Sequence, residues 1–156
     1  MAIADSNCWD ENPPGLDVEP MEFDTKIVIV IAEDLPVWQK LNVTAFLTSG
    51  IIGATEGIMG EVYRDGSDQN YLPLCIQPMM IMKTNRDRLR TFLNRANSRG
   101  VAAAVYIEDM FATGHDAANR ETVILYTTDE LPLVGLAVRG ERKEIDKIVK
   151  GAKLHD

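Results

Sequence analysis

Four apolar runs along the chain have the pattern of strands that are buried on both faces. Residues 26–32 form the clearest run and read Lys-Ile-Val-Ile-Val-Ile-Ala. Residues 72–83, 101–107 and 131–138 are the other three. Pro78 interrupts the run 72–83 and restricts that part of it to an edge strand or a bulge. Continuous apolar runs of this length are typical of strands covered by helices on both sides, so we expect a sheet of about four strands.

Helical patterns alternate with these runs. Asp34 precedes a predicted helix over residues 36–49, and Asn85 precedes a second over residues 86–99. Both residues are good N-caps. A last short helix is predicted over residues 141–150. The alternation of strands and helices predicts a three-layer α/β/α sandwich with a mixed, mostly parallel sheet.

Other segments have weaker signals. Residues 61–63 and the turn residues 65–66 predict a short hairpin or a loop, and residues 116–122 have the composition of a short capped helix. Residues 123–126 either end that helix or form a strand. In the first predicted helix, we expect Val37 and Leu41 to belong to the apolar stripe that faces the sheet.

Charge is distributed unevenly along the chain. The net charge is −8, but residues 1–25 contain seven acidic residues and no Lys or Arg, so residues 26–156 carry a net charge of only −1. We expect residues 1–24 to be a disordered acidic tail and residues 25–156 to be the folded domain. The acidic tail disfavours nucleic acid as a partner, although the near-neutral body leaves room for a local basic patch.

The sequence favours a cytoplasmic protein. No apolar run approaches the roughly 18 residues of a transmembrane helix, and the first residues lack the basic and apolar regions of a signal peptide. Cys8 lies in the tail and Cys75 in an apolar run, so no disulfide framework is implied. His115 and His155 are the only histidines, and no ligand pair has zinc-like spacing. We expect no metal, no cofactor and no membrane partner.

Candidate chemistry is concentrated in residues 108–116, which follow a predicted buried strand. This segment holds three carboxylates, a hydroxyl and a histidine within nine residues. Asp109 is placed to orient a water molecule or to accept its proton, with Thr113 and His115 nearby. The alternative is that Asp109 and Thr113 satisfy backbone amides in a turn or cap. Both interpretations remain open at this point.

The first predicted helix adds three candidate binding residues. Asn42 and Thr44 either bond locally or point into a pocket. Lys40 is either a solvated surface lysine or an anion contact near the crevice beyond the strand ends. The second predicted helix is the best phosphate-binding candidate, unless its basic side chains simply form a solvated face. Its arginines are Arg86, Arg88, Arg90, Arg95 and Arg99.

Three segments resemble the type II peptidyl-tRNA hydrolases. Residues 26–35 resemble the opening strand of these enzymes, and Ile107-Glu-Asp-Met-Phe-Ala-Thr113 resembles their strand-end Asp followed four residues later by Thr. Residues 134–154 are similar to their closing strand and helix. An uncharacterised bacterial domain family with the same fold resembles the chain more closely, through Asp34-Leu-Pro and residues 41–50. The resemblance implies a peptidyl-tRNA hydrolase II-like fold over residues 25–155.

The functional expectation follows from what this resemblance retains. Thr44 and Leu47 stand where the hydrolases have Gln and His, and Lys40 matches a family lysine only after a one-residue shift. We therefore expect a non-catalytic module that binds a ligand or partner, the ligand being a small molecule or an RNA-linked ester. The alternative is a divergent hydrolase of esters or aminoacyl esters, in which Asp109 activates water and Thr113 orients it. The resemblance also implies a homodimer.

Overall fold

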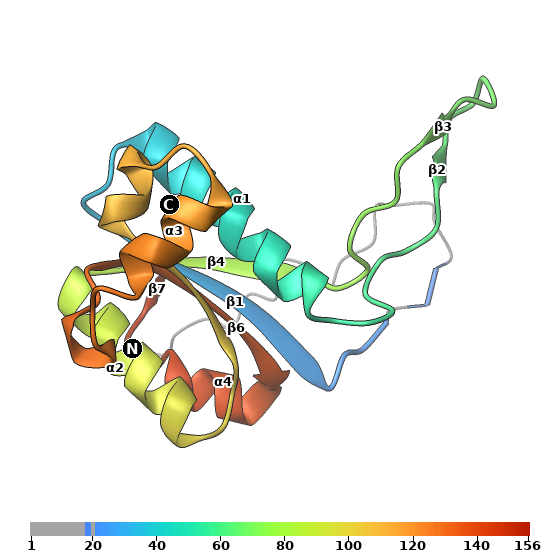
Figure 1. Ribbon diagram of the computed structural model, residues 1–156. Coiled ribbons are helices and arrows are strands. Elements are labelled where there is room, and N and C mark those ends of the chain that lie inside the picture. Colours follow the sequence, from blue (N-terminus) through green and yellow to red (C-terminus); the bar gives the residue numbers. More distant parts are fainter. Residues whose placement is uncertain (1–17, 20) are drawn as a thin grey trace.

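A mixed sheet of five strands forms the centre of the domain (Figure 1). The computed structural model describes residues 18, 19 and 21–156, so most of the predicted disordered tail, residues 1–24, lies outside the described residues. The strand order is β5-β6-β1-β4-β7. The strands are β1 (Thr25–Ala32), β4 (Met79–Thr84), β5 (Ala103–Ile107), β6 (Leu133–Glu141) and β7 (Lys153–Leu154).

The strand directions correct the prediction of a mostly parallel sheet of about four strands. Only the β1–β4 pairing is parallel, whereas β6 is antiparallel to both β1 and β5, and β7 is antiparallel to β4. An apolar run reports burial on both faces and carries no information on direction, which explains the error. The fifth strand, β7, spans two residues and is too short to leave a periodic signal. Because β6 separates β1 from β5, the strands β1, β4 and β5 still run in the same direction.

Helices cover both faces of the sheet, as the predicted three layers require. Figure 1 shows α1 on one face and the pair α2 and α4 on the other, with α3 beside α1. The helices are α1 (Val37–Gly53), α2 (Arg86–Ser98), α3 (Asp116–Val123) and α4 (Arg142–Ile148), with short 3-10 helices η1 (Glu108–Ala112) and η2 (Thr128–Glu130). Of the helices described, none is long and apolar enough to cross a membrane.

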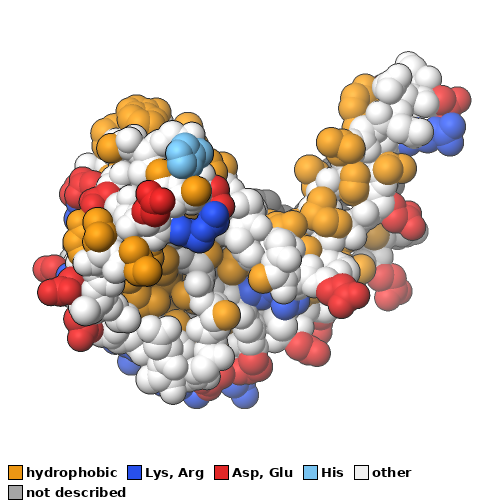
Figure 2. Space-filling view, in the orientation of Figure 1, with side chains coloured by type: hydrophobic (Ala, Val, Ile, Leu, Met, Phe, Trp, Pro, Cys, Tyr) orange, Lys and Arg blue, Asp and Glu red, His pale blue; other side chains and the backbone are white. Residues whose placement is uncertain are grey.

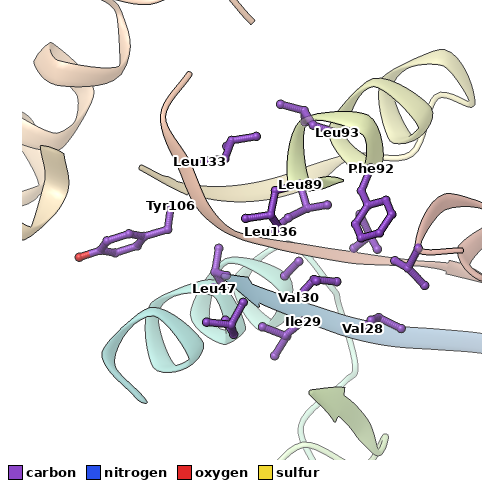
Figure 3. Close-up of a cluster of buried hydrophobic side chains, with 14 of the residues drawn as sticks. Val28, Ile29, Val30, Leu47, Leu89, Phe92, Leu93, Tyr106, Leu133 and Leu136 are labelled. Carbon is purple, nitrogen blue, oxygen red and sulfur yellow. The ribbon is translucent and has the colours of Figure 1, made fainter. Parts of the chain in front are cut away.

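The core lies on both sides of β1. Residues 27–32 of β1 are all at most 1% exposed, which confirms the predicted burial. Figure 3 shows Leu47 of α1 on one side of the sheet and Leu89 and Phe92 of α2 on the other. Each such side chain contributes about 1.5–3 kcal/mol when it is fully buried. This packing fixes where the ends of β1, α1 and α2 lie.

The buried face of α1 differs from the predicted stripe. Val43, Leu47 and Ile51 face the sheet, whereas Val37 and Leu41 are 73% and 67% exposed. Apolar residues occur on all sides of this helix, so its periodicity does not identify the buried face. The outward apolar face of α1 is therefore free to line a surface site.

The arginines of α2 hold neighbouring elements together. Arg95 donates to the carbonyl oxygens of Ile148 and Lys150 at 3.2 and 3.1 Å, and Arg99 pairs with Glu144 at 2.8 Å. Arg86 and Arg88 also have protein partners, described below. Four of the five arginines therefore connect α2 to other segments of the domain. The Asn85 cap is confirmed, because its side chain accepts from the Arg88 amide at 3.0 Å.

A hairpin arm, residues 59–76, projects from the body of the domain (Figure 1). The predicted hairpin is confirmed by β2 (Tyr63–Arg64) and β3 (Asn70–Tyr71), which pair antiparallel. Near the base of the arm, the Gly60 amide donates to the Leu74 carbonyl oxygen at 2.9 Å. The second half of the arm takes up residues 72–76, so the predicted strand over residues 72–83 begins only at Met79. Apolar side chains are exposed along the arm (Figure 2): Met59, Val62, Tyr63, Tyr71, Leu72, Leu74 and Ile76.

Candidate functional site

A groove lies between α1 and the segment that follows β5. It consists of two adjoining cavities of about 520 and 300 Å³. Both volumes lie within the roughly 300–1,000 Å³ typical of small-molecule sites. The two cavities form one continuous groove, named the aromatic groove here, because they share five lining residues: Phe46, Tyr106, Met110, Asp116 and Asn119.

A row of four aromatic rings lines this groove. The ring centroids of Trp38 and Phe111 are 5.9 Å apart, and the next two spacings are 5.2 Å from Phe111 to Tyr106 and 6.0 Å from Tyr106 to Phe46. All three pairs are edge-on or tilted, which suits the quadrupoles of the rings. Trp38 and Phe46 project from the outward face of α1 and are 60% and 55% exposed. Their ring surface is therefore available to a ligand.

Polar groups lie among these rings. The Tyr106 hydroxyl donates to Asn42 Oδ1 at 3.4 Å, and burial raises the pKa of this tyrosine, which keeps the hydroxyl neutral. The Asn119 side chain contacts the Thr113 hydroxyl. Within the described part of the chain, the amide nitrogens of Asn42 and Asn119 have no hydrogen-bond acceptor. Both can therefore donate to a ligand in the groove.

The structure gathers three of the six predicted site residues at the outer part of the groove. Asn42, Thr113 and His115 line the smaller cavity. Lys40, Thr44 and Asp109 do not line either cavity. The Thr44 hydroxyl donates to the Lys40 carbonyl oxygen at 2.8 Å, which is the local bond that a helical threonine often makes.

The residues proposed to activate water form hydrogen bonds with other groups of the protein. Asp109 Oδ2 accepts from the Tyr126 hydroxyl at 2.7 Å, and this bond raises the pKa of Tyr126. The Thr113 hydroxyl donates to the Met110 carbonyl oxygen at 2.8 Å. His115 Nδ1 accepts from the Ala118 amide at 3.2 Å and so caps α3. These contacts fit the turn-and-cap interpretation, and the hydrolase alternative stays a prediction.

The carboxyl ends of β1, β4 and β5 meet at one edge of the sheet. Arg86 follows β4, and its guanidinium pairs with Asp34 after β1 at 2.9 Å and with Glu108 after β5 at 2.6 Å. Asp34 does not cap α1, whose N-cap residue is Pro36. Across the described residues, no group of three or more His, Cys, Asp or Glu side chains is placed to hold a metal ion.

Sequence reasoning missed the aromatic residues of the groove. They come from three elements, α1, β5 and η1, and only the folded chain brings them together. One signal was present, because Trp38, Asn42 and Phe46 are four residues apart and lie on one side of a helix. Two aromatic rings flanking an amide at this spacing form a recognisable surface stripe. It was overlooked because apolar residues at helical spacing usually belong to a core.

Fold and groove define a three-layer α/β domain with an open groove between α1 and α3. Residues 25–156 match the family described as "Protein of unknown function (DUF2000)", and the chain belongs to this family. The chain is also similar to a solved structure, that of the protein of unknown function Atu0240 from Agrobacterium tumefaciens strain C58. The two are 52% identical, with a TM-score of 0.85 over 86% of this chain and 100% of the other. No curated protein matches the chain.

Proposed function

We propose that the domain is a non-catalytic binding module whose aromatic groove holds a small, flat molecule with hydrogen-bonding groups. The observation that carries the proposal is the continuous row from Trp38 through Phe111 and Tyr106 to Phe46. Exposed aromatic faces bind planar rings by stacking, which is tolerant of the identity of the ring. The amides of Asn42 and Asn119 supply the few oriented polar contacts that give such sites their specificity.

The charges at the groove favour a ligand without a large net charge. Asp116 and Arg120 both line the larger cavity of the groove and form an ion pair with each other. Neither cavity contains a further Lys, Arg, Asp or Glu. A strongly charged ligand would find no free counter-charge on these walls, so a neutral aromatic compound fits best.

A panel of nucleosides, free nucleobases and aromatic amino acids tests this proposal. Binding is detected by the rise in melting temperature at increasing ligand concentration, because a ligand that binds only the folded state stabilises it. Calorimetric titration then measures Kd. We expect at least one compound of the panel to bind saturably to the wild-type domain.

The informative variant is Phe46→Ala, and its matched control is Tyr71→Ala on the arm. Both remove an aromatic ring that is about half exposed, 55% and 53%, so neither opens a cavity in the core. We expect Phe46→Ala to weaken binding about tenfold, since it removes both stacking and buried apolar area. Tyr71→Ala should leave Kd unchanged. Equal effects of both variants, or no binding by any compound, would contradict the proposed site.

The non-catalytic part of the proposal has its own test. Hydrolysis of N-blocked aminoacyl-tRNA is measured with the wild-type protein and with Asp109→Asn. We expect no turnover by either protein, because the Asp109 carboxylate and the Thr113 hydroxyl have structural partners. Turnover by the wild type that is lost in a folded Asp109→Asn variant would establish the hydrolase alternative instead.

We also propose that the fold is of the peptidyl-tRNA hydrolase II type. The three segments that carry the resemblance supply β1, the end of β5 and β6, which are neighbours in the sheet. Segments far apart in sequence that share a resemblance and lie side by side support a common architecture. Superposition of the Cα atoms on a type II peptidyl-tRNA hydrolase structure tests this, and a different strand order in that enzyme would overturn it.

A further inference from the structure

A second, smaller cavity lies where the parallel neighbours β1 and β4 end. The chain leaves β1 for α1 on one face of the sheet and leaves β4 for α2 on the opposite face (Figures 1 and 3). In open α/β sheets, a crevice forms between two parallel strands whose connections diverge in this way. The cavity here measures about 200 Å³, which is below the roughly 300 Å³ at which sites for drug-sized ligands begin. It is suited to one small chemical group.

Positive charge dominates the walls of this cavity. Lys83, Arg88 and Lys153 line it, and Glu33 is the one acidic side chain among its lining residues. Lys83 pairs with Asp156 beside the cavity. Arg88 Nη1 donates to the Gly151 carbonyl oxygen at 2.8 Å, which positions the guanidinium and leaves its other donors available. This concentration of cations is notable in a chain with a net charge of −8.

The hydroxyl of Thr84 adds to the cations. Thr84 also lines the cavity and is only 5% exposed, yet its hydroxyl has no hydrogen-bond partner among the residues that the structure describes. The Thr84 oxygen is not among the polar atoms sealed from solvent without a partner, so this hydroxyl is open to a group that enters the cavity. Asn85, the N-cap residue of α2, also lines the cavity, so the N-terminus of this helix lies at the wall. The positive end of the helix dipole favours a negative group at the same place.

We propose that this cavity binds a phosphate group, either as inorganic phosphate or as the terminal group of a small phosphate monoester. Three kinds of donor line it: two ammonium groups, a guanidinium and a hydroxyl. A tetrahedral dianion has enough acceptor oxygens to satisfy donors that approach from several directions. Glu33 disfavours a second negative group, so the bound molecule carries its phosphate at one end only. The site is independent of the aromatic groove, and its failure would leave the proposed function intact.

Titration with inorganic phosphate, followed by the amide signals of a ¹⁵N-labelled protein, tests the proposal. Chloride replaces phosphate at constant ionic strength in the reference titration, which removes general screening effects. A second titration uses glycerol 3-phosphate, and comparison of the two Kd values distinguishes a site for free phosphate from a site for a monoester. We expect saturable shifts confined to residues 83–88 and 151–153.

Two pairs of variants assign the binding to this cavity. Lys153→Gln removes a cation that lines the cavity, and Lys150→Gln removes an exposed cation three residues away that does not line it. Thr84→Val removes the hydroxyl with nearly the same shape, and Thr84→Ser keeps it. We expect Lys153→Gln and Thr84→Val each to raise Kd at least about fivefold, in line with the loss of a charged or buried hydrogen bond. Lys150→Gln and Thr84→Ser should remain within about twofold of the wild type.

Several results would overturn the proposal. Linear, unsaturated shifts would show general ion effects, and equal weakening by Lys153→Gln and Lys150→Gln would show attraction to surface charge. Saturable shifts centred on other residues would place the anion elsewhere. The amide spectrum of each variant confirms that it is folded, so a loss of binding cannot be mistaken for unfolding.

Discussion

The Arg86 guanidinium holds the Asp34 carboxylate at the edge of the sheet, with Nε 2.9 Å from Oδ2 and 3.2 Å from Oδ1. The same guanidinium reaches Glu108 through Nη1 at 2.6 Å. The hydrogen bond with Glu108 is the main cause of the raised pKa of Arg86. One side chain therefore ties together the ends of β1, β4 and β5. Of these strands, β5 borders the aromatic groove and β4 borders the small cavity lined by Lys83 and Thr84.

Arg86→Gln tests how much this junction contributes to stability. The three side chains are between about one third and a little over half exposed, so each ion pair is worth at most about 1 kcal/mol. We expect the free energy of unfolding to fall by about 1 kcal/mol, measured by urea denaturation, and the difference to shrink at high salt. Arg90→Gln is the control, because Arg90 is exposed on the same helix and has no described partner. An equal loss in both variants would mean that helix propensity, not the junction, is responsible.

Gly135→Ala tests the close contact between β6 and α1. An added Cβ would lie 2.5 Å from Val43 Cγ1 and 2.8 Å from Leu47 Cδ1, and both side chains are buried. Valine is stiff about χ1 and cannot easily move away, so we expect a loss of about 2 kcal/mol by chemical denaturation. Gly53→Ala is the matched control, since its Cβ would meet nothing within 4 Å. It should leave stability unchanged or raise it by up to about 1 kcal/mol; a comparable loss at both positions would refute the steric explanation.

Tyr126→Phe tests the hydrogen bond to Asp109 through its pH dependence. This bond raises the pKa of Tyr126 in the folded state. Its contribution is therefore fully present below the pKa of an unfolded tyrosine, about 10, and is lost as the pH rises through the folded value. We expect the wild type to exceed the variant in urea midpoint by a constant amount below about pH 10, and this difference to shrink above it. Tyr63→Phe, on the arm, should show no such trend; a difference that does not change with pH would rule out the linkage.

Deletion of residues 61–73 tests whether the arm supports the fold. Gly60 and Leu74 already share a hydrogen bond at 2.9 Å, so an Asn-Gly turn can join them. Every residue in 61–73 except Pro73 is exposed, and we expect the free energy of unfolding to change by no more than about 0.5 kcal/mol. A loss above about 2 kcal/mol would show that the arm is part of the folding unit.

Light scattering on the wild type and on the variant that lacks residues 61–73 also tests the homodimer that the sequence resemblance implies.

Local patterns predicted the elements whose signals lie within one segment. The β-branched residues 27–31 predicted β1 because a strand repeats every two residues and both of its faces are covered here. Asn85 predicted the start of α2 through a bond to an amide three residues away. The turn at residues 65–66 predicted the hairpin for the same reason, since a turn depends on four consecutive residues.

Features that depend on distant partners were not predicted. The insertion of β6 between β1 and β5 makes most pairings antiparallel, although the apolar run of β6 looks the same in either direction. The prediction of the buried face of α1 is wrong because Val37 and Val43 are equally apolar, and only the packed sheet shows that Val43 lies close to Gly135 on β6. The bond between Asp109 and Tyr126 joins residues 17 positions apart, which no local pattern predicts, and the catalytic role of Asp109 stays a prediction.

The sequence by itself determined where the long buried strands, the main helices and the hairpin turn lie, although not the short strand β7 or the first residue of β4. These properties follow from side chains two to four positions apart, and their physics is local. Only the tertiary structure decided the order and direction of the strands, the aromatic groove and the small cavity lined by Lys83, Arg88 and Lys153. Each of these joins groups that are far apart in the chain, such as Trp38 with Phe111 or Thr84 with Lys153. Their proximity arises from the packing of whole elements, which no single stretch of residues encodes.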